Sequence, residues 1–267
     1  MTVLYFERST AAAENPPTAV FLHGFMGSIE DWTPIRAELE GAFDCIFIDL
    51  PGHGQSPPLA QPKPDDRRPA VQQITDAILD VLDRESIEKP HIVGYSMGGR
   101  VALHLAICAP GRVKSLVLES TSPGLSGAAA RDARAALDSR RADALRAHGL
   151  GAFLDDWYQA GLFESLRLHP RFDEMLRLRK KGDAAALATV IEAMSPGRQP
   201  DHWPHLPDLH ISTLLLAGAL DHRYTESTRE AAALLPDAQF QIASDAGHNI
   251  HFEAPKWFIQ VLTEFIS

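Results

Sequence analysis

Short apolar runs alternate with longer amphipathic segments along most of this chain. Runs rich in Val, Ile, Leu and Phe are typical of parallel strands that are buried on both faces. The segments between them repeat apolar residues at three- and four-residue spacing, which predicts helices. This alternation predicts an α/β fold with a mostly parallel central sheet flanked by helices. The predicted strands are residues 3–6, 18–22, 43–50, 91–93, 113–119, 211–217 and 238–242, and the predicted helices are 32–39, 71–82, the segment after residue 98, 227–235 and 255–266.

The pattern changes between residues 126 and 200, where no apolar run of the strand type occurs. Ala, Arg, Leu, Asp and Glu recur there at helical spacing. We therefore expect a helical cap, residues 123–205, inserted into a core formed by residues 1–122 and 206–267. Open α/β sheets bind ligands at the carboxyl ends of their strands, so such a cap would cover the site. The predicted cap helices are 128–148, 150–159, 170–180 and 183–193.

The pattern Gly94-x-Ser96-x-Gly98 lies where a predicted strand meets a predicted helix. This is the sequence form of a nucleophile elbow, a sharp turn that exposes a serine hydroxyl beside a helix N-terminus. The N–H of the next residue, Met97, would be one oxyanion donor. The glycine-containing loop after strand 18–22 would supply the second, which we assign to the N–H of Phe25.

A serine needs a histidine to accept its proton and a carboxylate to orient that histidine. In this fold they follow in the order Ser, Asp or Glu, His. Asp221 and His248 each come directly after a predicted strand, so both should reach the edge of the sheet that carries Ser96. His251 could replace the histidine, and Asp245 or Asp49 could replace the acid; His222 lies too close to Asp221 to be its oriented partner. The other histidines considered, expected in loops or at the surface, are His53, His148, His169, His202, His205 and His210.

Composition narrows the class of protein. The 267 residues are 45% hydrophobic and 22% charged, as expected of a globular enzyme, and the net charge of −10 argues against nucleic acid as a partner. No apolar run approaches the ~20 residues of a membrane helix, and residues 1–8 lack a secretion pattern. Cys45 and Cys108 lie in apolar contexts and are expected to be core thiols, which suits the cytoplasm. The sequence has no H-E-x-x-H motif, cysteine cluster or G-x-G-x-x-G motif, so we expect no metal and no dinucleotide cofactor. The oligomeric state is left open.

With the elbow, the His23-Gly24-Phe25 loop and Gly247-His248 in place, the chain resembles the α/β-hydrolase superfamily. More closely, it resembles the 2-succinyl-6-hydroxy-2,4-cyclohexadiene-1-carboxylate (SHCHC) synthase family of menaquinone and phylloquinone biosynthesis. That resemblance implies a carbon–oxygen lyase without a cofactor. Its small polycarboxylate substrate is 2-succinyl-5-enolpyruvyl-6-hydroxy-3-cyclohexene-1-carboxylate (SEPHCHC), from which pyruvate is eliminated. The segments that carry this closer resemblance are 94–100, 116–125, 134–138, 153–158, 176–179 and 247–251.

The resemblance also implies roles for residues. Ser96, assisted by His248, would abstract a proton without being acylated. Substrate carboxylates would be bound by Arg100, Arg134 and Arg179, and the aromatic pocket residues would be Tyr95 and Trp157. Arg177 is the main rival of Arg179, and a packing or surface role remains open for each of these side chains. Independently of the resemblance, an arginine directly after the elbow is unusual for an apolar ester pocket and suits a carboxylate.

Two other classes of function remain open. The same triad would serve a serine hydrolase of carboxylesters, or of carbon–carbon bonds in ring-cleavage products, and the scaffold also occurs in signalling receptors. A hydrolase predicts a mostly apolar cap pocket, whereas the lyase predicts one rich in arginine. His222 and Arg223, which follow the predicted acid, have no role that the resemblance explains.

Overall fold

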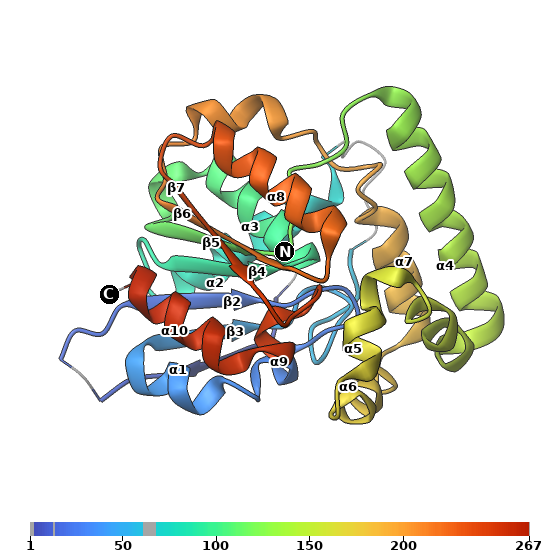
Figure 1. Cartoon of the computed structure of the whole chain (residues 1–267), viewed down its shortest axis with the longest axis horizontal. Helices are drawn as coiled ribbons and strands as arrows, with labels where there is room; N and C mark the ends of the chain where they lie inside the picture. The colour runs from blue at the N-terminus through green and yellow to red at the C-terminus, as the bar shows by residue number, and fades with distance from the viewer. Residues whose placement is uncertain (1–2, 13, 61–67, 267) are drawn as a thin grey trace.

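A seven-stranded sheet forms the centre of the computed structural model, which describes residues 3–12, 14–60 and 68–266. The strand order is β1-β3-β2-β4-β5-β6-β7, and only β1 runs antiparallel to its neighbour. The predicted α/β fold is therefore confirmed (Figure 1). The strands are β1 (Phe6–Ser9), β2 (Thr18–Leu22), β3 (Asp44–Ile48), β4 (His91–Tyr95), β5 (Ser115–Glu119), β6 (Thr213–Gly218) and β7 (Ala238–Ala243).

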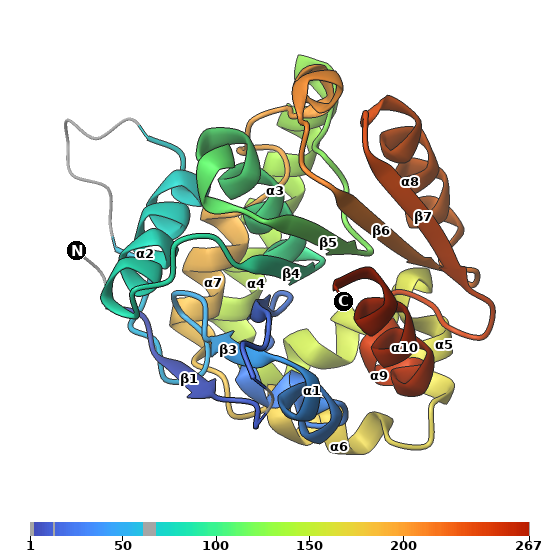
Figure 2. The same ribbon diagram turned by 90° about the vertical axis from the view of Figure 1, so that its left-hand side faces the viewer.

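Helices cover both faces of this sheet (Figure 2). The helices α2, α3 and α8 lie on one face, and α1 and α10 lie on the other. Strand side chains alternate between the two cores: Val20 and Leu22 belong to the first, and Ala19 and Phe21 to the second. Since both faces of the inner strands are buried, those strands are mostly apolar, whereas the edge strands β1 and β7 are only partly buried and alternate with polar residues. The helices of this layer are α1 (Arg36–Ala42), α2 (Ala70–Arg84), α3 (Met97–Cys108), α8 (His222–Leu234), α9 (Ile250–Glu253) and α10 (Pro255–Ile266), and the 3-10 turns are η1 (Ile29–Trp32), η2 (Pro110–Arg112) and η4 (Trp203–Asp208).

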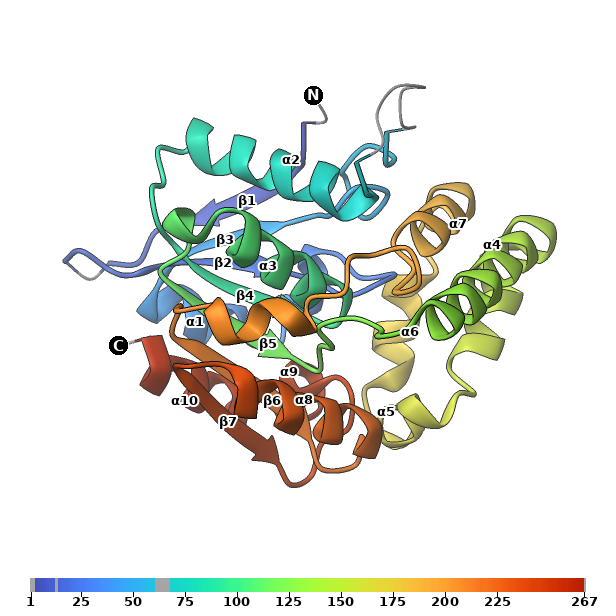
Figure 3. The same ribbon diagram turned by 90° about the horizontal axis from the view of Figure 1, so that it is seen from above.

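The chain between β5 and β6 forms a separate helical layer at one side of the sheet (Figures 1 and 3). We call α4 to α7 the cap helices. The predicted segments 128–148 and 150–159 together form α4, and Gly149 interrupts the helical backbone between them with φ 77°. A glycine adopts this conformation without the steric cost of a side chain. The cap helices are α4 (Ala128–Trp157), α5 (Glu164–Leu168), α6 (Phe172–Arg179) and α7 (Ala184–Ala193), with the 3-10 turn η3 (Gly161–Phe163) before α5.

Three local predictions are wrong. The first edge strand is Phe6–Ser9 and not residues 3–6, because Phe6 pairs with Ile48 at the end of β3. The helix predicted at 32–39 is divided into η1 and α1, with Pro34 between them, since proline has no N–H with which to continue a helix. Cys108 is exposed at the end of α3, whereas Cys45 is buried as predicted.

Among the histidines expected in loops or at the surface, His53 and His202 are buried. The prolines and charges of residues 57–70 predict a surface loop, and its residues 61–67 lie outside the described residues. Over the described ranges, no helix is long and apolar enough to span a membrane.

Buried histidines make the stability of the fold dependent on pH. Burial lowers the pKa of His202 from 6.5 to about 4, with His104 adding to the effect. Burial lowers the pKa of His91 to about 4 as well. The folded chain therefore binds fewer protons than the unfolded chain between these values, so stability falls as pH falls through this window. Each histidine contributes at most about 3 kcal/mol to that loss, because screening by solvent reduces the effect.

We therefore expect the melting temperature to fall between pH 6.5 and pH 4, and His202→Gln to remove part of that fall. Replacement of the exposed His148 by Gln is the matched control. Thermal unfolding at a series of pH values measures both variants. Equal slopes for His202→Gln and His148→Gln would show that burial of His202 does not carry the effect.

Candidate active site

The turn between β4 and α3 holds Ser96 in a conformation that few serines adopt, with φ 50° and ψ −107°. A side chain at Gly94 would place its Cβ 2.6 Å from the carbonyl oxygen of Gly98, so the turn requires glycine there. The neighbouring strand fixes the turn, because the Ser96 N–H donates to the Glu119 carbonyl oxygen over 2.9 Å. The elbow is thus rigid, and it projects the hydroxyl from the end of the sheet.

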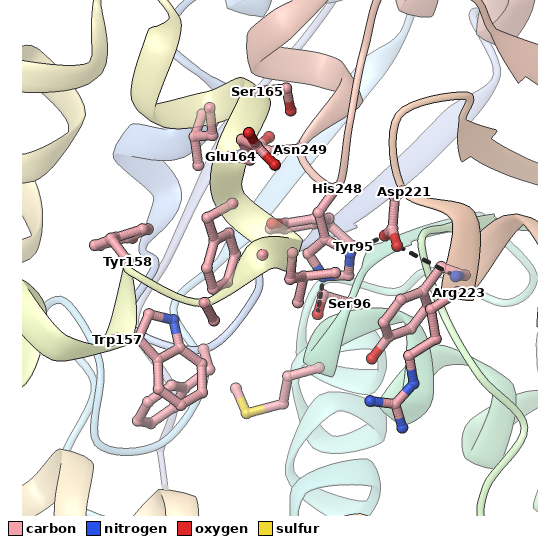
Figure 4. A pocket seen from close by; sticks show the side chains of 18 of the residues that line it. Tyr95, Ser96, Trp157, Tyr158, Glu164, Ser165, Asp221, Arg223, His248 and Asn249 are labelled. Carbon is pink, nitrogen blue, oxygen red and sulfur yellow. Dashed lines mark hydrogen bonds and ion pairs between the residues drawn. The ribbon is translucent and has the colours of Figure 1, made fainter.

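The structure places Ser96, His248 and Asp221 within hydrogen-bonding distance (Figure 4). The Ser96 Oγ lies 3.0 Å from His248 Nε2, and His248 Nδ1 lies 2.7 Å from Asp221 Oδ2. Asp221 follows β6 and His248 follows β7, as the order of the strands requires. Asp221 also accepts the N–H of Tyr224 over 3.2 Å and so caps α8. The arrangement can move a proton from the serine hydroxyl to the imidazole.

The rival residues occupy other places. The His251 Nδ1 lies 2.7 Å from the carboxylate of Glu119, and both side chains are fully buried. Asp245 is exposed beside Ser244. Asp49 accepts the backbone N–H groups of Ile29 and Gln55, so its carboxylate shapes a loop. None of these three side chains has a hydrogen bond to Ser96 or His248 in the described chain.

Glu119 has a part in this geometry that the sequence reasoning missed. Its carbonyl oxygen accepts the hydrogen bond from the Ser96 N–H. Its carboxylate accepts the backbone N–H of His251, three residues beyond His248. One residue of β5 therefore links the elbow to the segment that carries His248, the predicted catalytic histidine. The available signal was a carboxylate at the end of an apolar strand, where a charge needs a buried partner.

The loop after β2 leaves Phe25 facing the cavity with its N–H free of any hydrogen bond in the described residues. The next N–H, of Met26, donates to His53 Nε2 over 3.1 Å. Burial holds the pKa of His53 well below its usual value, so the ring stays neutral and can accept this bond. Met97, at the start of α3, also has an N–H without an intrahelical acceptor. Both predicted oxyanion donors thus line the same cavity as Ser96.

A cavity of about 790 Å³ lies between the triad and the cap helices. Five arginines contribute to its polar lining, which favours the lyase over the mostly apolar pocket that a carboxylester hydrolase predicts. The arginines that line it are Arg100, Arg134, Arg141, Arg179 and Arg223.

Arg100 is the predicted carboxylate ligand nearest the elbow. One of its nitrogens, Nη1, donates to the carbonyl oxygen of Met194 over 2.8 Å and to the side chain of Gln199. Both acceptors are neutral, so the positive charge of Arg100 has no carboxylate beside it. Burial lowers the pKa of Arg100 to about 10, which still leaves the side chain cationic at neutral pH.

Arg179 lines the cavity, whereas its rival Arg177 is exposed and outside it. The Arg179 guanidinium forms a two-pronged ion pair with Asp31, with a distance of 2.8 Å from Nη2 to Oδ2. It also donates to the Met26 carbonyl oxygen over 3.1 Å. Arg179 therefore joins α6 of the cap to the oxyanion loop, and its charge is already neutralised.

Arg134 and Arg141 share one buried carboxylate, that of Asp138, at 2.7 Å and 3.0 Å. The pair therefore has one positive charge more than it has negative. The Arg141 guanidinium lies 5.0 Å above the ring of Trp157, which also packs against Phe25 with ring centroids 5.4 Å apart. The predicted aromatic residue Trp157 thus lines the cavity and connects the cap to the oxyanion loop (Figure 4).

Tyr95, the second predicted aromatic residue, lies under the triad. Its ring centroid is 5.5 Å from that of His248 and 4.9 Å from that of His251. Burial raises the pKa of Tyr95 well above its usual value, so its hydroxyl stays protonated. The side chain packs against the His248 imidazole and also reaches the cavity.

Comparison with known proteins places this site in a family. The sequence matches the alpha/beta hydrolase fold family over residues 17–255. It is 34% identical over 251 residues to the 2-succinyl-6-hydroxy-2,4-cyclohexadiene-1-carboxylate synthase of Serratia proteamaculans. This match covers 94% of this chain and 93% of that relative. It is 33% identical over 260 residues to the chloroplastic protein PHYLLO of Arabidopsis thaliana; the match covers 93% of this chain and only 15% of that longer protein. Among solved structures, MenH from S. aureus superposes with a TM-score of 0.88 at 31% identity, covering 99% of this chain and 98% of that one.

Proposed function

The chain belongs to the alpha/beta hydrolase fold family and, within it, to the SHCHC synthases, and we propose that it eliminates pyruvate from SEPHCHC to give SHCHC. It is then a carbon–oxygen lyase of menaquinone or phylloquinone biosynthesis. The observation that carries the proposal is a serine triad facing a cavity lined by five arginines. A substrate with three carboxylates needs that charge, and an uncharged ester does not.

The reaction needs a base and a stabilised oxyanion. In SEPHCHC the ring carbon C2 carries a proton beside the ketone of the succinyl group, and C5 carries the enolpyruvyl oxygen. Removal of the C2 proton forms the C2=C3 double bond, the C3=C4 electrons move to C4=C5, and the C5–O bond breaks. The leaving group is the enolate of pyruvate, which takes up a proton at its methylene carbon. The reaction is an elimination in which no acyl group is transferred and no water is consumed. It therefore requires no acyl-enzyme intermediate.

Ser96 and His248 are the proposed base. The imidazole Nε2 takes the hydroxyl proton over the 3.0 Å contact, and the serine oxygen takes the C2 proton. Asp221, 2.7 Å from Nδ1, stabilises the imidazolium that results. The proton held by His248 is then available for the enolate of the leaving group. A triad whose serine would be acylated in an esterase is thus proposed to serve here for proton transfer alone, with Ser96 and His248 moving the protons and Asp221 stabilising the imidazolium.

The N–H groups of Phe25 and Met97 are the proposed donors to the ketone oxygen, which gains negative charge as C2 loses its proton. Arg100, Arg134 and Arg179 are the proposed carboxylate ligands, and Tyr95 and Trp157 bound the pocket. Because Asp31 neutralises the charge of Arg179, the proposed role of Arg179 is to orient a substrate carboxylate by hydrogen bonding. Its bond to the Met26 carbonyl oxygen also holds the loop that carries Phe25. We propose the cytoplasm as the compartment, since both cysteines are free.

We expect the purified protein to release pyruvate from SEPHCHC and to hydrolyse p-nitrophenyl esters poorly. A coupled lactate dehydrogenase assay measures pyruvate, and ultraviolet absorbance follows the conjugated diene. Both signals should rise together, because elimination produces one diene for each pyruvate. Rapid ester hydrolysis without pyruvate would contradict the proposal and favour the hydrolase alternative.

A further inference from the structure

The cavity arginines differ in how their charges are balanced. The carboxylate of Asp31 neutralises Arg179, and Asp138 serves Arg134 and Arg141 together. One charge of the pair on Asp138 and the charges of Arg100 and Arg223 therefore form no ion pair, since Asp221 and Glu164, which also line the cavity, form none with an arginine in the described residues. In the described part of the chain, Arg223 has no hydrogen bond, ion pair or ring contact, and its side chain is exposed.

Arg223 is held beside the triad by its neighbours in sequence. It lies in the first turn of α8, two residues after Asp221, on the same side of the pocket as the triad (Figure 4). The N–H of Tyr224 donates to Asp221, and its ring centroid lies 4.6 Å from that of His248. The backbone of Arg223 is thus fixed by residues that contact the catalytic acid and base, while its side chain is free.

The N-terminus of α8 already has an anion, because the Asp221 carboxylate caps the helix and accepts the N–H of Tyr224. Asp221 also lies 2.7 Å from His248 Nδ1, so this carboxylate is engaged within the triad. The guanidinium of Arg223 is therefore the group that this end of α8 offers to an anion in the cavity. Cavity lining and a guanidinium without an ion pair coincide at one point on the side of the cavity formed by α8.

We propose that Arg223 binds one carboxylate of the substrate at the open side of the cavity and so contributes to substrate specificity. This inference rests on the function proposed above. With it, Arg223 joins Arg100 and the pair of Arg134 and Arg141 as a source of charge for the three carboxylates of SEPHCHC, while Arg179, which is paired with Asp31, contributes hydrogen bonds. Arg223 then acts in binding and takes no part in proton transfer, which remains with Ser96 and His248.

The test compares Arg223→Ala, Arg223→Lys and Arg223→Glu with Arg177→Ala, a charge-matched control outside the cavity. We expect KM for SEPHCHC to rise about tenfold in Arg223→Ala, as loss of one charged hydrogen bond implies, with kcat within about twofold. Lysine should recover part of the loss, and glutamate should raise KM further. KM of Arg223→Ala should also depend less on salt than that of the wild type.

A KM in Arg223→Ala equal to that of Arg177→Ala, with the wild type active, would overturn the role of Arg223 and leave the proposed function intact. A wild type that releases no pyruvate would overturn the proposed function instead. In that case calorimetric titration with citrate, a tricarboxylate probe, still tests the site. Weaker citrate binding by Arg223→Ala than by Arg177→Ala supports it, and equal or absent binding counts against it.

Discussion

Ser96→Ala should lower kcat for pyruvate release by about 10²–10⁴-fold, the range expected when a positioned base is removed. KM should change little, because the hydroxyl is proposed to act on the C2 proton and the arginines are proposed to bind the carboxylates. The elbow itself should persist, since alanine has no larger side chain than serine and the Ser96 N–H bond to Glu119 is made by the backbone. Steady-state kinetics with SEPHCHC measure both constants.

The matched control is Ser165→Ala, because Ser165 lines the same cavity but is not part of the triad (Figure 4). It should retain activity within a few-fold of the wild type. Intact-protein mass spectrometry during turnover separates a base from a nucleophile. An unmodified wild-type mass supports proton abstraction, whereas a covalent adduct on Ser96 would contradict it. Equal losses in Ser96→Ala and Ser165→Ala would remove Ser96 from the mechanism.

The sequence was sufficient for the parts of the site that local rules determine. Gly94 is needed by the tight turn and Gly98 by its close approach to the backbone at the end of β2. Asp221 and His248 follow strands whose carboxyl ends meet at one edge of the sheet. Parallel order and right-handed connections leave few ways to arrange such strands. The break in α4 at Gly149 was likewise visible, because two helical patterns meet there.

The partners of the charged side chains could not be predicted in this way. Asp31 lies 148 positions before Arg179, and no periodicity links η1 to α6. The contact depends on how the cap packs over the oxyanion loop, which is a tertiary property. Glu119 and His251 are 132 positions apart and pair for the same kind of reason. Residue types thus indicated which arginines are available, and only the structure shows which of them are neutralised.

The second large effect is expected at Arg100, because no carboxylate of the described chain forms an ion pair with it. Arg100→Met should lower kcat/KM roughly 30- to 4,000-fold, which corresponds to about 2–5 kcal/mol of lost transition-state stabilisation. This is the loss expected when one partner of a buried charge pair is removed, the pair here being Arg100 and a substrate carboxylate. Methionine keeps most of the apolar length of the side chain, so the change removes mainly the charge and the hydrogen bonds. Arg100→Lys retains the charge but not the planar guanidinium, so its kcat/KM should lie between those of the wild type and Arg100→Met.

The stability of the free enzyme should respond differently from its activity. Burial lowers the pKa of Arg100 to about 10, so the empty site holds a cation in surroundings that disfavour it. Its removal relieves that cost but leaves the Met194 carbonyl oxygen without its donor. Since the two effects oppose each other, the free energy of unfolding measured in urea should change by less than about 1 kcal/mol.

A destabilisation of several kcal/mol would instead assign Arg100 a structural role in joining α3 to the segment after α7. Unchanged kcat/KM would exclude it from substrate binding. Lost activity in a chain of unchanged stability would show that its charge is compensated by the substrate and not by the fold.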